Sequence, residues 1–142
     1  MPDILHAIQT SASSDAVLPL VSTAAGLARW WAADITEQDG AVELGFFKRK
    51  TLYRLKLQGH PSAARTEWLC ENGEEWAGTR ILFELKPGWP GTVLRFTHGG
   101  WKAQTPYFVS CNTTWGELIY RLKAEAEGSP RGPLFTRDGM GY

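Results

Sequence analysis

The sequence predicts an α+β fold, in which a curved antiparallel sheet of six or seven strands wraps around one long C-terminal helix. Three observations predict it: an apolar stripe with helical spacing near the C-terminus, five consecutive segments that alternate with a period of two, and short turn-like connections between those segments. The 142 residues suffice for one domain with a single core. Because the helix and the sheet each present one apolar face, we expect them to pack against each other.

The best-specified element is a helix predicted over residues 114–128. Its large apolar side chains share one face, and they are Trp115, Leu118, Ile119 and Leu122, followed by Ala126. Thr114 and Glu117 form a capping box at the start, and Gly128 predicts the end. Burial of four large side chains at ~1.5–3 kcal/mol each contributes on the order of 6–12 kcal/mol before entropy is counted. Such a helix requires a large apolar partner surface.

The N-terminal part predicts one strand and two short helices. Residues 4–10 alternate as a strand does, and short helices follow over residues 15–21 and 24–31, each preceded by a Ser or Thr that can cap it. Pro19 has no backbone N–H and is expected to shorten or kink the first of them. Residues 34–40 are polar and predict a turn.

The partner surface is predicted in the middle of the chain. Strands are expected over residues 41–47, 51–59, 64–71, 78–86 and 92–98. Short connections predict antiparallel neighbours in a meander. Alternation places on one face Tyr53, Leu55, Leu57, Thr66, Trp68, Cys70, Ile81, Phe83, Leu85, Leu94, Phe96 and His98. Charged and polar side chains occupy the other face, so the apolar face is the surface that the helix is predicted to cover.

Composition excludes several classes of protein. Lys plus Arg and Asp plus Glu each number 15, and a formal net charge of zero argues against nucleic acid as a partner. No apolar run approaches the ~18 residues of a membrane span, and the N-terminus lacks a secretory signal pattern. Cys70 and Cys111 have no metal-type or CxxC spacing, and the three histidines are scattered. We therefore expect a cytoplasmic protein with free thiols, no metal and no other cofactor.

Three short segments resemble a known family. They are TAAGLARWW at residues 23–31, GTVLRFTH at 91–98 and CNTTWGEL at 111–118. In this order of elements they resemble the helix-grip fold of the START-like superfamily, also called SRPBCC. The resemblance is sharpest in the branch related to the activator of heat-shock-protein ATPase and to polyketide cyclases. Residues 1–128 are thus assigned to a START-like domain, and residues 129–142 to a Gly/Pro-rich tail expected to be loop or disorder, in which Leu134, Phe135 and Tyr142 are candidates for docking.

The resemblance implies an apolar cavity between the sheet and the long helix, with its mouth near the short helices. Carried over by position, the ligand-binding residues are Trp31, Tyr53, Thr66, Trp68, Phe83, Phe96, His98 and Trp115. Aromatic side chains also fill ordinary cores, so the tryptophans among them fit a packed interior as well as a ligand site. The resemblance implies that the gap is hollow, whereas the alternation alone places most of these residues inside.

A few residues carry possible chemistry. His98 is either a general acid or base, since its pKa lies near neutrality, or a hydrogen-bonded core residue. The segment HGGW at residues 98–101 resembles an oxyanion loop, but the chain has no G-x-S-x-G elbow, which argues against a serine hydrolase. Cys111 precedes the predicted helix, and thiol pKa values can fall at a helix N-terminus. Cys111 is therefore either a reactive thiol or a structural residue. The basic turn at residues 48–50 is a solvated turn or a contact for an acidic partner.

Three functions are consistent with these residues. The first is a non-enzymatic protein that binds a small apolar or amphipathic molecule under the helix, with His98, Tyr53 or Thr66 fixing one polar group. The second is a protein-interaction domain that regulates a chaperone. The third is a cyclase-like or hydrolytic enzyme, which is weakened because the inward strand positions contain no Asp or Glu. No catalytic residue is assigned, and the sequence does not set the oligomeric state.

Overall fold

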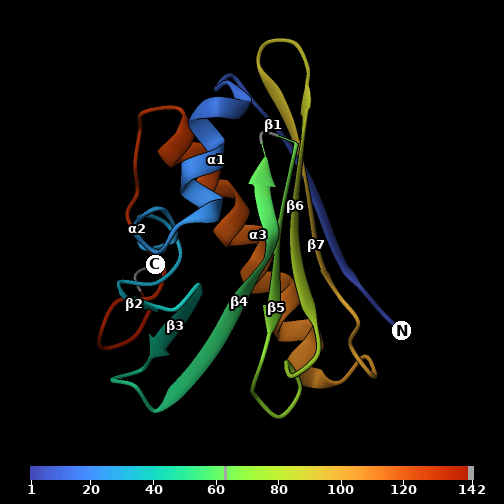
Figure 1. Cartoon of the computed structure of the whole chain (residues 1–142), viewed down its shortest axis with the longest axis vertical. Helices are drawn as coiled ribbons and strands as arrows, with labels where there is room; N and C mark the ends of the chain where they lie inside the picture. The colour runs from blue at the N-terminus through green and yellow to red at the C-terminus, as the bar shows by residue number, and fades with distance from the viewer. Residues whose placement is uncertain (63, 141–142) are drawn as a thin grey trace.

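A computed structural model describes residues 1–62 and 64–140, and it confirms the predicted fold class. Within these ranges lie three helices, α1 (Ser14–Ser22), α2 (Ala24–Leu27) and α3 (Pro106–Ala126), and seven strands, β1 (Ile4–Thr10), β2 (Asp34–Gln38), β3 (Ala41–Phe46), β4 (Thr51–Ser62), β5 (Arg65–Cys70), β6 (Arg80–Pro87) and β7 (Thr92–Gly99). The strands form one antiparallel sheet in the order β1-β7-β6-β5-β4-β3-β2. Helix α3 crosses one face of this curved sheet, and α1 and α2 pack beside it (Figure 1).

Helix α3 begins eight residues earlier than the sequence analysis predicts. Its N-cap is Thr105, whose hydroxyl accepts a hydrogen bond from the Phe108 N–H, and Pro106 occupies the first turn. The predicted capping box at Thr114 is therefore wrong, because that residue lies inside the helix. Buried Phe108 and Cys111 extend the apolar stripe toward the N-terminus at helical spacing. A Thr-Pro pair is a recognised start signal, so the sequence did contain the information.

The polar segment predicted as a turn at residues 34–40 is mostly a strand. Residues 34–38 form β2, which pairs with β3 at the edge of the sheet. Asp39 and Gly40 connect the two strands with φ of 54° and 77°, which is the backbone of a tight two-residue hairpin. Edge strands tolerate polar side chains because one of their sides faces solvent. The second short helix is also shorter than predicted and ends at Leu27.

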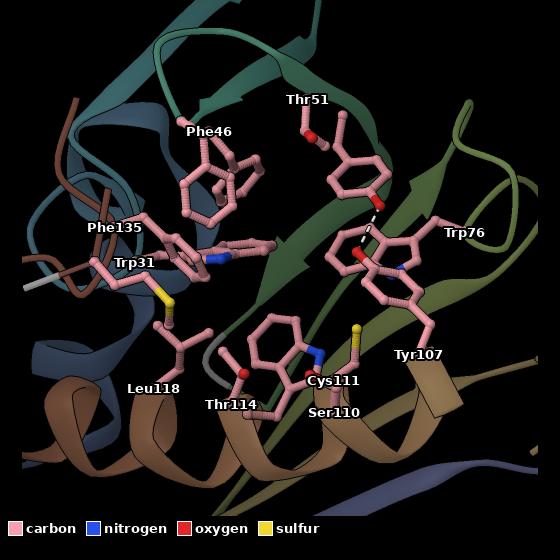
Figure 2. Close-up of a pocket in the computed structure, with 14 residues that line it drawn as sticks. Trp31, Phe46, Thr51, Trp76, Tyr107, Ser110, Cys111, Thr114, Leu118 and Phe135 are labelled. Atoms are coloured by element: carbon pink, nitrogen blue, oxygen red, sulfur yellow. Dashed lines mark hydrogen bonds between the residues drawn. The ribbon is translucent and has the colours of Figure 1, made fainter. Parts of the chain in front are cut away.

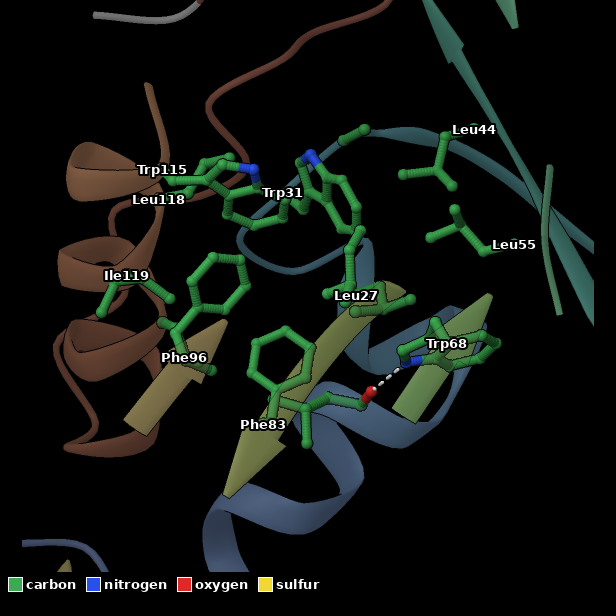
Figure 3. Close-up of a cluster of buried hydrophobic side chains, with 14 of the residues drawn as sticks. Leu27, Trp31, Leu44, Leu55, Trp68, Phe83, Phe96, Trp115, Leu118 and Ile119 are labelled. Atoms are coloured by element: carbon green, nitrogen blue, oxygen red, sulfur yellow. Dashed lines mark hydrogen bonds between the residues drawn. The ribbon is translucent and has the colours of Figure 1, made fainter. Parts of the chain in front are cut away.

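Two tryptophans connect α1 to the rest of the core by hydrogen bonds to its last turn. The Trp30 Nε1–H donates to the Leu20 carbonyl at 2.8 Å, and the Trp68 Nε1–H donates to the Val21 carbonyl at 2.9 Å (Figure 3). Carbonyls in the last turn of a helix have no partner within the helix, so these indoles satisfy them. Helix α2 also contacts α1 closely, since a Cβ at Gly26 would lie 1.9 Å from the Pro19 carbonyl oxygen. Only glycine allows this approach.

Within its described residues, the segment after α3 has no helix or strand, and it is docked on the domain through Leu134 and Phe135, two of the residues that the sequence offers for docking. Gly128, with φ of 83°, ends the helix region, and the Leu134 side chain is 0% exposed. The backbone N–H groups of Leu134 and Phe135 donate to the carbonyls of Trp30 and Trp31. This docked tail, residues 129–140, returns the chain to the loop after α2. Tyr142, the third candidate for docking, lies outside the described residues.

Among the described residues, no helix combines the length and the apolar character that a membrane crossing requires. Cys70 and Cys111, both in the described part of the chain, are buried free thiols.

Candidate ligand-binding cavity

A cavity of about 250 Å³ lies between α3, the β3–β4 turn and the docked tail. Its lining comprises Trp31, Phe46, Phe47, Thr51, Tyr53, Trp76, Tyr107, Ser110, Cys111, Thr114, Trp115, Leu118, Phe135 and Met140. Phe47, Tyr107 and Ser110 are exposed at their outer edges. The opening is therefore beside the β3–β4 turn and the first turns of α3, and not beside α1 and α2 as the family resemblance implies.

One end of the cavity is apolar and aromatic. Figure 2 shows Trp31, Phe46, Leu118 and Phe135 gathered on this side. The rings of Phe46 and Phe135 meet edge to face with centroids 4.8 Å apart, and Trp31 contacts Trp115 at the same centroid distance. Phe46 comes from β3, Trp31 from the loop that follows α2, Trp115 from α3, and Phe135 from the tail. The apolar end is thus held by segments that are far apart in the sequence.

The other end is polar, with Trp76, Tyr107 and Cys111 lying there (Figure 2), and Tyr53 also belongs to it because it contacts Trp76 and Tyr107. The hydroxyls of Tyr53 and Tyr107 are hydrogen-bonded at 2.7 Å. The Tyr53 ring stacks on Trp76 with centroids 4.0 Å apart and an interplanar angle of 9°. The Trp76 Nε1–H is buried and has no hydrogen-bond partner among the residues that the structure describes.

The polar groups of this end are neutral at physiological pH. Burial raises the pKa of Tyr53, and burial followed by the hydrogen bond between the two hydroxyls raises the pKa of Tyr107. Burial also raises the pKa of Cys111, against smaller lowering contributions from Trp76 and Tyr107. Cys111 lies in the second turn of α3 and not ahead of its N-terminus. The sequence-based alternative of a thiol activated by a helix end is therefore wrong.

His98 is a fully hydrogen-bonded core residue. The Trp115 Nε1–H donates to His98 Nδ1 at 3.1 Å, so this nitrogen carries no proton. His98 Nε2 lies 2.8 Å from the Thr79 hydroxyl, which itself donates to the Trp76 carbonyl and must accept from the imidazole. Burial lowers the pKa of His98 to about 3. Both ring nitrogens are thus engaged, and His98 is not available as a general acid or base in this arrangement.

Acid is expected to destabilise the protein through His98. The folded-state pKa of about 3 lies below the ordinary value of 6.5, so the unfolded chain binds a proton that the folded chain excludes. The stabilising contribution is complete above pH 6.5 and decreases as the pH falls toward 3, by on the order of 3 kcal/mol at pH 4. Urea unfolding between pH 7 and pH 4 measures the free energy of unfolding of the wild type and of His98→Gln. If the free energies of unfolding of the two proteins differ by the same amount at every pH in this range, the prediction is contradicted.

The structure separates the eight sequence-predicted ligand residues into two groups. Trp31, Tyr53 and Trp115 line the cavity. The other five are buried but are not among the lining residues that the structure describes, and they are Thr66, Trp68, Phe83, Phe96 and His98. Figure 3 shows Phe96 next to α3, Phe83 beside it and Trp68 farther from α3, and the ring centroids of Phe83 and Phe96 are 5.3 Å apart. The space predicted as one hollow is therefore filled over this part of the sheet.

Several lining residues were not predicted from the sequence. Trp76 lies in the connection between β5 and β6, which has no periodicity. Tyr107 and Ser110 precede the predicted helix start, and a Thr-Pro capping signal would have placed them on α3. Phe135 and Met140 belong to the docked tail, where Gly and Pro predict loop. Among the described residues, no group of three His, Cys, Asp or Glu side chains gathers as metal ligands do.

Comparisons with known proteins identify similar structures. No family model matches the sequence, and no curated protein matches it either. The Aha1 dimer from Colwellia psychrerythraea is 28% identical, with 91% of this chain and 98% of that chain covered and a TM-score of 0.80. The AHSA1-like protein from Aeromonas hydrophila is 14% identical, with 92% and 96% covered and a TM-score of 0.67. CalU16 from Micromonospora echinospora is also 14% identical, with 92% and 68% covered and a TM-score of 0.72. The two structures at 14% identity share the fold.

Proposed function

We propose that this chain, which has the START-like helix-grip fold and resembles the Aha1-related branch, binds a small and largely apolar molecule in the cavity under α3. The observation that supports it is a hollow that remains in an interior otherwise filled with aromatic side chains. Its volume of about 250 Å³ lies between the ~150 Å³ of an engineered cavity that takes benzene and the ~300 Å³ at which drug-sized sites begin. A molecule of one or two rings fits this space.

The lining also restricts the charge of the ligand. The lining residues that the structure describes include no Lys, Arg, Asp or Glu. A charged molecule would lose its hydration here without gaining an ion pair, which is unfavourable in a buried apolar site. A neutral molecule instead exchanges water for aromatic walls on several sides. The proposed ligand is therefore uncharged, with most of its surface apolar.

A cavity-filling variant tests this proposal. Thr114→Phe places a ring in the cavity from α3, whereas Thr113→Phe places the same ring on the exposed side of the same helix. We expect Thr114→Phe to weaken the binding of indane, a two-ring hydrocarbon, by at least about tenfold, and Thr113→Phe to change it by less than about twofold. Isothermal titration calorimetry measures both affinities. Circular dichroism checks that both variants are folded.

Two results would overturn the proposed function. One is the absence of saturable indane binding to the wild type. The other is equal binding by the folded Thr114→Phe variant and the wild type, which would place the ligand elsewhere.

A second candidate function is protein interaction, and the 28% identity to a protein whose structure is a dimer favours it. The basic turn at residues 48–50 is part of the fold in this chain. Arg49 donates to both carboxylate oxygens of Asp34 at 2.9 and 3.0 Å and also pairs with Glu43. Charge reversal of Lys48 and Lys50, with Arg49 kept, therefore tests an acidic partner surface without disturbing this ion pair. Sedimentation of the chain alone and titration with a chaperone middle domain are the two measurements.

A further inference from the structure

The polar end of the cavity contains a buried donor that the fold leaves unpaired. Trp76 is 5% exposed, and its ring stacks on the Tyr53 ring and makes a T-shaped contact with His98 at a centroid distance of 4.7 Å. Its Nε1–H has no hydrogen-bond partner among the described residues. Buried polar groups are nearly always paired, so an exception beside a cavity indicates a place for an acceptor that is not part of the protein.

The Cys111 thiol lies next to this donor and does not replace an oxygen acceptor. It interacts with the Trp76 Nε1–H and with the Tyr107 hydroxyl, since both contacts act to lower the pKa of the thiol. The Trp76 contact does not meet the geometry of a hydrogen bond, and a thiol sulfur is a weak acceptor. Two donors, one from the β5–β6 connection and one from α3, therefore converge beside the same sulfur atom.

The tyrosine pair supplies a free proton. Two hydroxyls carry two protons, and the 2.7 Å hydrogen bond between Tyr53 and Tyr107 uses one of them. When Tyr53 donates to Tyr107, the Tyr107 proton is available beside Cys111. An oxygen atom placed there would accept from Tyr107 and Trp76 together. The polar end thus offers two donors for a single acceptor.

Charge at this end disfavours an anion. Burial keeps Tyr53, Tyr107 and Cys111 protonated, as their raised pKa values indicate. The Glu75 carboxylate accepts from the Thr105 hydroxyl at the start of α3, and its negative charge also raises the pKa of Tyr53 and Cys111. A ligand carboxylate would meet the same repulsion without a cation in the described lining to offset it.

We infer that the cavity selects neutral molecules of one or two rings that carry a hydrogen-bond acceptor, such as a ketone, aldehyde or amide oxygen, held by the Trp76 Nε1–H and the Tyr107 hydroxyl. The apolar rings of such a ligand lie against Trp31, Phe46 and Phe135, and its oxygen points toward Cys111. This inference rests on the proposed function and adds the chemistry that the cavity recognises.

Two ligands that share a skeleton test the inference. Indane has a CH₂ group where 1-indanone has a carbonyl, and both are titrated into the wild type, Trp76→Phe and Phe135→Leu. The quantity compared is the ratio of the indane Kd to the 1-indanone Kd in each protein. We expect Trp76→Phe to lower this ratio by about fivefold, the effect of one hydrogen bond. Phe135→Leu removes a ring at the apolar end whose recorded ring contacts are Phe46 and Phe47, and it is expected to leave the ratio unchanged within about twofold.

The outcomes separate the inference from the proposed function. An equal ratio in the wild type and Trp76→Phe overturns the inference, even when both ligands bind. Failure of the wild type to bind either ligand overturns the proposed function instead. Tyr107→Phe removes only the Tyr107 hydroxyl, which is the second proposed donor. It is expected to lower the ratio of the indane Kd to the 1-indanone Kd, as Trp76→Phe does. If Trp76→Phe does not fold, Tyr107→Phe decides, and an unchanged ratio in that variant refutes the assignment.

Discussion

Replacement of His98 by alanine is expected to lower the free energy of unfolding by about 3–5 kcal/mol, because it removes a buried ring together with its hydrogen bonds. The His98 ring contacts Trp76, Trp101 and Trp115 at centroid distances of 4.7, 4.9 and 5.9 Å. Without the imidazole, the Trp115 Nε1–H becomes a buried donor without an acceptor. Urea unfolding at pH 7, followed by tryptophan fluorescence, measures the change.

His6→Ala is the matched control for this substitution. His6 lies half-buried on β1, where Nε2 contacts the Asn112 carbonyl oxygen at 3.2 Å and the ring contacts Phe96. Because water can replace part of these contacts, we expect a cost of about 1 kcal/mol or less. If His98→Ala costs no more than His6→Ala, the imidazole is not the polar centre of the core, and the hydrogen-bond network described above is wrong.

Leu134→Ala is expected to lower the free energy of unfolding by about 2–4 kcal/mol, although it lies in a segment without helix or strand. The side chain is 0% exposed, and truncation of a buried leucine leaves a cavity that the surroundings fill only in part. Leu5→Ala is the matched control, since Leu5 is 67% exposed and its truncation is expected to cost less than about 0.5 kcal/mol. Equal effects of the two substitutions would contradict a docked tail.

Hydrogen exchange gives a second measurement on the same segment. The backbone N–H groups of Leu134 and Phe135 donate to carbonyls of Trp30 and Trp31 at 3.2 and 2.9 Å. We expect both amides to be protected in the wild type and to lose protection in Leu134→Ala. Exchange at the rate of an unstructured chain in the wild type would show that the tail is not docked in solution. Because Phe135 and Met140 line the cavity, the same variant is expected to bind indane more weakly.

The sequence predicts those parts of the fold that bury one regular face. Alternation in β4–β7 and the stripe from Trp115 to Leu122 identify the sheet and most of α3, since burial on one side requires these periods. Strand β2 lacks an apolar face because it is an edge strand, so periodicity does not detect it. The first turns of α3 carry two signals, the continuation of the stripe by Phe108 and Cys111 and the Thr105 cap followed by Pro106, and the prediction of a start at Thr114 used neither.

The cavity is less predictable than the fold. Trp31, Tyr53 and Trp115 lie on elements that the sequence places inside, and they line it. Trp76 and Phe135 come from segments without periodicity, where position depends on contacts with distant residues and not on the local pattern. Whether an interior is hollow depends on the summed shapes of many side chains, and alternation carries no information about that sum.

Helix α3 and the docked tail come last in the chain, and this order has a consequence for biosynthesis. A ribosome adds roughly 5–20 residues per second, so the strands of the sheet emerge seconds before the segment that covers their aromatic face. During this interval no helix covers Phe83, Phe96 and their neighbours, and the nascent chain exposes an apolar surface to other molecules in the cell. The growing polypeptide is thus most vulnerable to aggregation just before translation of residues 106–140, the segment containing α3 and the docked tail, is complete.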